Sequence, residues 1–102
     1  MKTEEVLAVL TKHFKLDSVN PKHLNVKAHP DAQDAVVITP TTRYDTDSFS
    51  INRPQRTMLD VYFNFIYITT STTVANMLYR RHGHMEWGHL KLHGHNYHIM
   101  RK

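Results

Sequence analysis

The sequence predicts an α+β fold, built as one small domain over residues 1–102. Two segments, near residues 3–14 and 72–82, carry apolar side chains at helical spacing. The runs between and after them alternate polar with apolar residues or are rich in β-branched and aromatic ones, which is typical of strands. A chain of 102 residues can bury one hydrophobic core. Its 40% hydrophobic and 22% charged content indicates a folded domain and not a disordered segment.

The first helix is expected to begin at Thr3, whose hydroxyl suits the N-cap position. Glu4 and Glu5 follow in the first turn, where the helix dipole favours negative charge. The apolar face of this helix would comprise Val6, Leu7, Val9, Leu10 and Phe14. A small N-terminal helix with one buried side is therefore predicted.

Strand signals occupy the middle of the chain. Residues 23–29 alternate between polar and apolar side chains, and residues 35–39 form a β-branched run that Pro40 is expected to end. Residues 41–52 fit a third strand or a hairpin arm. Aromatic and β-branched residues dominate near 59–68, so we expect a central strand of an antiparallel sheet there, although part of this run also keeps helical spacing.

The second helix, near residues 72–82, has a signal at each end. Ser71 is a favourable N-cap, and Gly83 stands where a left-handed C-cap would fall. Arg80 and Arg81 lie in the last turn, where the helix dipole favours positive charge. These two arginines therefore have a structural explanation as well as a functional one.

A C-terminal β-hairpin is expected after this helix. A two-residue turn at His93-Gly94 fits the preference of such turns for glycine. The turn would pair Leu92 with His95, Leu90 with Tyr97, and His89 with His98.

The positive charge of the chain lies in its C-terminal part. Residues 1–60 hold eight Lys and Arg against eight Asp and Glu, whereas residues 61–102 hold five against one, which accounts for the net charge of +4. Six of the nine histidines also lie there and would add charge near their ordinary pKa of about 6.5. An anionic partner is therefore predicted, either nucleic acid or an acidic protein surface of a nucleoprotein complex.

The predicted partner-binding residues are the lysines and arginines of this segment and the two aromatic residues that lie among them. Trp87 and Tyr97 would stack on nucleobases or, equally, be buried in the core. The full set is Arg80, Arg81, Trp87, Lys91, Tyr97, Arg101 and Lys102.

Several classes of site and location are excluded or disfavoured by composition. The chain has no cysteine, which excludes disulfides, thiolate metal sites and cysteine nucleophiles. Its first residues do not resemble a signal peptide, and the longest apolar run, 61–68, is too short to cross a bilayer as a helix. We expect a cytoplasmic protein that does not bind membranes.

The clustered histidines leave two alternatives open. HGH occurs twice, at residues 82–84 and 93–95, and neutral imidazoles suit zinc, nickel or copper. The candidate ligands are His84, His89, His93, His95 and His98, with Glu86 as the nearby carboxylate. Alternatively, the protein is a histidine-dependent nuclease of the toxin type. Two histidines would then act as general acid and general base, and a lysine or arginine would stabilise the developing charge. The candidates are His89 and His98 with Lys91, or His93 and His95 with Arg81.

One short string has a counterpart in a known family. LHGHNY, residues 92–97, resembles the HGHxY motif of the pyruvoyl-tetrahydropterin synthase family. The resemblance implies that His93 and His95 bind zinc. That family typically carries a catalytic cysteine and continues well beyond the motif, whereas this chain has no cysteine and only residues 98–102 follow. The chain is therefore not assigned to the family.

The function predicted from sequence is non-enzymatic, with no catalytic residue and no cofactor assigned. We expect a small basic binding or inhibitory protein, of the kind that phages and mobile elements use, acting on nucleic acid or a nucleoprotein complex. The alternative is a histidine-dependent nuclease or a divalent-metal-binding protein.

Overall fold

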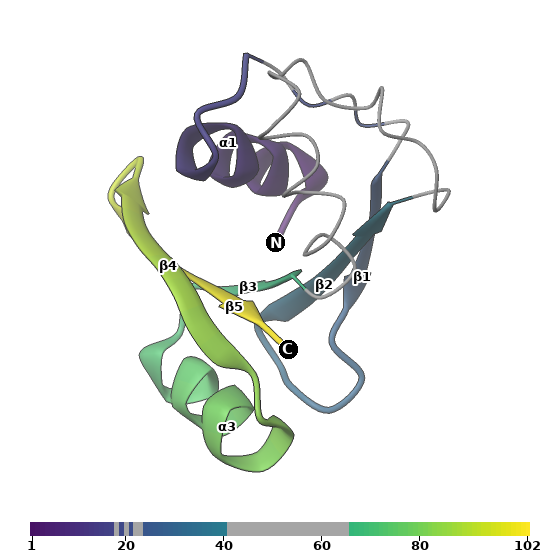
Figure 1. Ribbon diagram of the computed structural model, residues 1–102, viewed down its shortest axis with the longest axis vertical. Coiled ribbons are helices and arrows are strands. Elements are labelled where there is room, and N and C mark those ends of the chain that lie inside the picture. Colours follow the sequence, from purple (N-terminus) through teal and green to yellow (C-terminus); the bar gives the residue numbers. More distant parts are fainter. Residues whose placement is uncertain (18, 20, 22–23, 41–65) are drawn as a thin grey trace.

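In the part of the chain that the structure describes, a five-stranded antiparallel sheet has one helix on each face (Figure 1). The computed structural model describes residues 1–17, 19, 21, 24–40 and 66–102. In chain order the elements are α1 (Thr3–His13), β1 (Leu24–Ala28), β2 (Ala35–Pro40), β3 (Ile66–Thr69), α3 (Thr72–His82), β4 (Met85–Leu92) and β5 (His95–Arg101). The predicted α+β fold is confirmed.

Strand β3 lies at the centre of the sheet, whose order is β1-β2-β3-β5-β4. It pairs with β2 on one side and with β5 on the other, both antiparallel. The prediction of a central strand near 59–68 is thus confirmed for its last part. Residues 41–65, including the strand or hairpin arm predicted at 41–52, lie outside the described residues.

The C-terminal hairpin has the predicted turn and register. His93 and Gly94 have φ angles of 51° and 81°, both in the left-handed region that a two-residue turn of this kind requires. Leu92 pairs with His95, Leu90 with Tyr97, and His89 with His98. A register shift between Glu86 and Gly88 adds one residue, Trp87, to β4.

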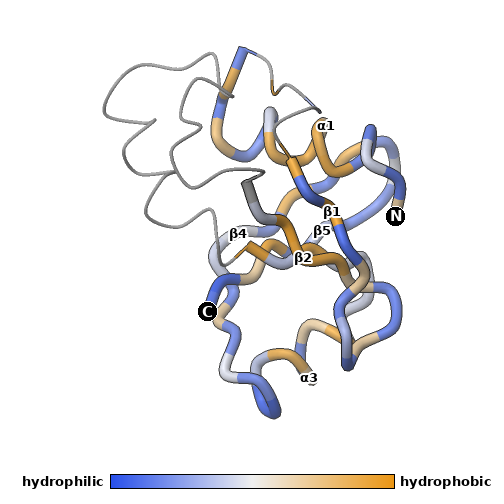
Figure 2. The backbone as a smooth tube through the Cα atoms, turned by 90° about the vertical axis from the view of Figure 1, so that its right-hand side faces the viewer, coloured by the Kyte–Doolittle hydropathy of each residue, from blue (hydrophilic) through white to orange (hydrophobic). Residues whose placement is uncertain are grey.

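The two faces of the sheet bury separate hydrophobic clusters. On the α1 side, Val6, Val9 and Leu10 pack with residues of every strand except β4, and Leu90 and Leu92 of β4 border this cluster. Figure 2 shows hydrophobic segments on α1 and on β2. The smaller cluster, on the α3 side, consists of Ala32, Ala35, Ala75, Leu78 and Met100. Alternate residues of β5 therefore enter different clusters.

Both ends of α3 agree with the sequence, whereas the start of α1 does not. Ser71 Oγ accepts a hydrogen bond from the Val74 N–H (3.2 Å), and Gly83, with φ of 69°, provides the left-handed C-cap of α3. The expectation that Thr3 caps α1 is wrong. The N-cap is Lys2, whose carbonyl accepts from the Val6 N–H, so Thr3 is already the first helical residue and the helix has no side-chain cap. Strand β2 has Pro40 as its last residue, where the sequence predicted its end.

Neither α1 nor α3 has the length and apolar content needed to cross a bilayer, and this holds for every helix in the described ranges.

A close contact between α1 and β4 depends on a glycine. A Cβ atom added at Gly88 would overlap the His13 ring. That ring lies edge-on to Phe14 and Trp87, with centroid distances of 4.8 and 5.9 Å. His13, which at the end of a helix would be expected at the surface, therefore helps to dock α1 onto the sheet.

We expect Gly88→Ala to lower the free energy of unfolding by about 1–3 kcal/mol, because the added methyl displaces the His13 ring. Urea denaturation measures this loss. His13→Ala removes the ring and should reduce the effect of Gly88→Ala in the double variant. Equal losses in the presence and absence of the ring would contradict the contact.

Candidate functional site

The lysines and arginines predicted to bind the partner lie in two separate regions of the structure. Arg80, Arg81 and Lys102 are exposed. The arginines end α3, and Lys102 follows Arg101, which pairs with Met85 at the start of β4, just after that helix. We call these three residues the α3 end. Lys91 lies near the hairpin turn, where Lys12 Nζ donates to its carbonyl (3.4 Å).

Strand geometry sets the distance between the two places. Met85, which opens β4, pairs with Arg101, whereas Lys91 pairs with Asn96 beside the turn. Six residues of extended chain separate Met85 from Lys91, which corresponds to about 20 Å. The structure therefore does not bring Lys91 together with the α3 end. Lys12 and Lys91 are called the hairpin end below.

The two predicted stacking aromatics are packed against the protein itself. Tyr97 is 3% exposed and belongs to the cluster under α1, so no nucleobase can stack on it in this state. Trp87 is half-buried, with its ring centroid 5.0 Å from that of Phe14. The Arg101 guanidinium lies 5.6 Å from the Trp87 centroid. Of the two alternatives left open by the sequence, burial holds for Tyr97.

Three histidines and a tyrosine meet where β1, β3, α3 and β4 approach one another. His84 stacks on Tyr67 with a centroid distance of 3.9 Å and an interplanar angle of 13°. His29, which follows β1, and His82, the last residue of α3, lie 5.7 and 5.6 Å from the His84 ring. No signal in the sequence had associated His29 or Tyr67 with this HGH motif.

Hydrogen bonds assign the tautomers of two of these rings. His29 Nδ1 accepts from the Asp31 N–H (3.1 Å), so a neutral His29 carries its proton on Nε2. Nε2 of His29 lies 3.5 Å from Nε2 of His84 and donates to it. A neutral His84 then carries its proton on Nδ1, which is buried and has no hydrogen-bond partner among the described residues.

Burial keeps these imidazoles uncharged. It lowers the pKa of His84 to about 4, and the neighbouring His29, His82 and Lys102 add to this by charge repulsion. The pKa of His29 is lowered by burial and by His82, against an opposing effect of Asp31. The expectation that all six C-terminal histidines gain charge on mild acidification is therefore wrong for His84.

The histidine pair is poorly arranged for a metal ion. A metal-binding imidazole offers a lone pair at one nitrogen and usually donates the N–H of the other. His29 instead uses Nδ1 as an acceptor, which leaves its Nε2 protonated. Within the ranges the structure describes, no group of three or more His, Asp or Glu side chains is placed to hold a metal.

The remaining histidines proposed as zinc ligands are dispersed or engaged. His93 lies in the hairpin turn and His95 opens β5, both exposed. His89 and His98 face each other as predicted, with ring centroids 4.9 Å apart. Both nitrogens of His98, however, already have protein partners.

His98 joins a hydroxyl to a carboxylate. Its Nδ1 lies 3.2 Å from Glu86 Oε1, and its Nε2 lies 3.2 Å from Thr72 Oγ1. The His98 side chain is 11% exposed and that of Glu86 is 50% exposed. The three residues line a groove of about 330 Å³ between α3 and the sheet. The sequence indicated Glu86 only as a candidate metal ligand, and His98 only as a metal ligand or as a nuclease residue beside His89. It gave no signal for Thr72.

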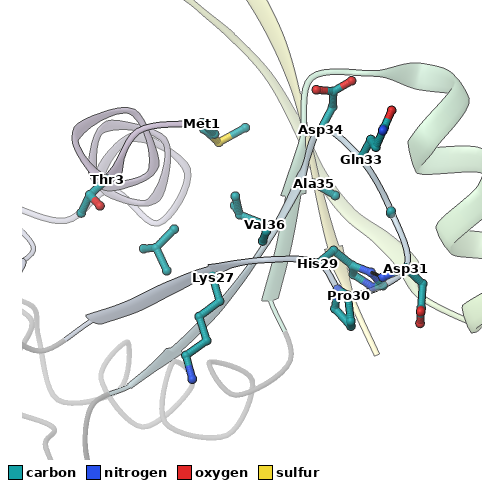
Figure 3. A pocket seen from close by; sticks show the side chains of 13 residues that line it. Met1, Thr3, Lys27, His29, Pro30, Asp31, Gln33, Asp34, Ala35 and Val36 are labelled. Atoms are coloured by element: carbon teal, nitrogen blue, oxygen red, sulfur yellow. Dashed lines mark hydrogen bonds between the residues drawn. The ribbon is translucent and has the colours of Figure 1, made fainter.

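A larger hollow lies elsewhere, at the β1–β2 connection. It has a volume of about 710 Å³, and Figure 3 shows Lys27, His29, Asp31 and Asp34 around it. Among the described residues of its lining, the two carboxylates outnumber the one lysine. The hollow is therefore a poor site for the predicted anionic partner.

Comparison with protein-family models, with curated proteins and with solved structures finds no match to this chain.

The buried histidines should make the fold sensitive to acid. In the unfolded chain His84 titrates near pH 6.5, whereas in the native state its pKa is about 4. Between these values the unfolded chain binds the extra proton, so stability is full above about pH 6.5 and decreases as the pH falls towards 4. We expect the free energy of unfolding to drop by about 1–2 kcal/mol from about pH 7 to 5, as measured by urea denaturation.

The matched variants are His84→Gln and His93→Gln, which remove a buried and an exposed imidazole respectively. His84→Gln should flatten the pH dependence of stability, whereas His93→Gln should leave its slope unchanged. The same slope in both variants would contradict the assignment to His84.

Proposed function

We propose that the protein binds nucleic acid, alone or within a nucleoprotein complex, through the α3 end. One observation carries the proposal: Arg80, Arg81 and Lys102 are exposed at the same end of the fold, in the segment that holds the entire net charge. Guanidinium groups bind phosphate oxygens through two parallel hydrogen bonds, and lysine adds a point charge.

The surroundings of the α3 end favour side-chain contacts with phosphate. The C-terminal end of a helix carries partial negative charge, so the backbone there does not attract anions and the arginines must do so. Asp31 lies near His29 and offsets part of the positive charge. His84 stays neutral at pH 6 and contributes none. The proposed binding therefore depends on three cations and not on His84.

An inhibitory role extends this proposal. A chain of 12.0 kDa that occupies the nucleic-acid site of a larger complex would block that site without any chemistry of its own. Small basic proteins of phages and mobile elements act in this way, which is an argument by analogy. The cysteine-free composition agrees with a cytoplasmic location, where such complexes occur.

Reversing the charge of the α3 end should weaken nucleic-acid binding. We expect Arg80→Glu/Arg81→Glu to reduce affinity for a labelled mixed-sequence DNA duplex or RNA strand by about 10-fold or more at moderate salt. The slope of log affinity against log salt should become shallower by about 0.7–0.9 for each phosphate group that the variant no longer neutralises. Fluorescence anisotropy over a salt series measures both quantities.

Lys12→Glu/Lys91→Glu is the control, because it changes the charge by the same amount at the hairpin end. We expect a much smaller loss of affinity there. Equal losses in the two double variants would show that only the net charge matters. No binding of either nucleic acid by the parent protein would reject the proposal and leave an acidic protein surface as the partner.

A further inference from the structure

In the groove beside α3, a carboxylate, an imidazole and a hydroxyl are linked by two hydrogen bonds. Glu86 comes from β4, His98 from β5, and Thr72 from the first turn of α3. Both links of the chain, Glu86 Oε1 to His98 Nδ1 and His98 Nε2 to Thr72 Oγ1, measure 3.2 Å. Elements distant in sequence thus converge on one ring, since Thr72 and His98 are 26 residues apart.

The hydrogen-bond directions follow from the chemistry of the groups. An ionised carboxylate only accepts, so the Glu86 carboxylate accepts from Nδ1–H of His98. The neutral ring then has a lone pair at Nε2, which accepts from the Thr72 hydroxyl. A hydroxyl held against an imidazole lone pair, with the opposite N–H on a carboxylate, is the arrangement that activates an oxygen nucleophile.

We propose that this group hydrolyses small uncharged carboxylic esters through an acyl intermediate on Thr72. As Thr72 Oγ1 bonds to the ester carbonyl carbon, His98 Nε2 takes the hydroxyl proton. The bond from that carbon to the alkoxy oxygen then breaks, and His98 returns the proton to the departing alcohol. Water attacks the acyl-threonine with His98 again as base, which releases the carboxylic acid and restores Thr72.

The groove determines the class of substrate. Its apolar residues are Ala75, Tyr79, Met85 and Met100, of which Tyr79 and Met85 are each 57% exposed at the surface. Among the described residues no lysine or arginine lines it, whereas Glu86 does. Phosphate esters would therefore be repelled, and a short acyl chain fits the volume of about 330 Å³. Thr72 is exposed and accessible to water, as deacylation requires.

Glu86 acts as a positioning residue, because it touches the imidazole and not the reacting atoms. Its carboxylate holds His98 in the Nδ1–H tautomer and stabilises the imidazolium that forms when Nε2 takes a proton. The site is independent of the nucleic-acid proposal. It lies at the first turn of α3, whereas Arg80 and Arg81 lie at the last, about 12–14 Å along the helix axis.

The test uses the full chain with p-nitrophenyl acetate and butyrate as substrates and a fluorophosphonate as a covalent probe. We expect turnover of both esters and one probe per chain, located on Thr72 by peptide mass spectrometry. Thr72→Val should lower the turnover rate by about 100-fold or more, and Thr72→Ser should retain turnover and labelling. Thr73→Val is the matched control, since Thr73 is the next exposed threonine on the same helix, whereas the hydroxyl that meets His98 belongs to Thr72.

The role of Glu86 has a separate readout. Glu86→Gln should lower kcat by about 10-fold or more and change KM much less, because Glu86 contacts the imidazole and not the reacting atoms. Histidines on the surface hydrolyse activated esters slowly, and this background must persist in Thr72→Val. Equal rates in Thr72→Val and Thr73→Val, or a probe attached elsewhere or not at all, would overturn the proposal. Melting temperatures show that each variant is folded.

Discussion

The register of the β4–β5 hairpin is the constraint on which the rest of the structure depends. The turn at His93-Gly94 places both residues in the left-handed region, and this geometry aligns the two strands. Successive side chains of a strand face opposite sides, so Tyr97 and Ile99 enter the cluster under α1 while Met100 enters the cluster under α3. A slip of one residue would exchange these faces and remove both cores together.

The same register arranges the chemistry of the C-terminal part. It directs His98 towards α3, where Thr72 and Glu86 meet its two nitrogens. It also separates Lys91 from Arg101 by most of the length of β4, so the positive charge divides between two ends of the molecule. Helix α3 carries residues of both proposed sites. Thr72, which lines the groove with Glu86 and His98, lies at its start, and Arg80 and Arg81 lie at its end. The His29–His84 pair beside that end is neutral and adds no positive charge to it.

Local signals made much of the fold predictable. Ser71, Gly83 and the His93-Gly94 turn each act within a few residues, so the sequence predicted α3 and the hairpin register correctly. The predicted N-cap of α1 was wrong by one residue, since Lys2 is the N-cap and Thr3 is the first helical residue. The histidine contacts were not predictable in this way. His29 meets His84 across 55 residues and Thr72 meets His98 across 26, and no periodic pattern connects residues so far apart. The separation of Lys91 from the arginines depends on the extended strand, along which residues near in sequence lie far apart.

Three histidines are held in one tautomer each, and nitrogen-15 NMR of the imidazole rings at about pH 8 tests this most directly. The predicted result is His29 protonated on Nε2, with His84 and His98 protonated on Nδ1. Exposed His93, in the turn, serves as the internal reference for a ring in solvent. Protonation of His98 on Nε2 would contradict the proposed hydrolytic site. Exchange between tautomers at His29 and His84, as at His93, would contradict the buried pair that makes the fold sensitive to acid.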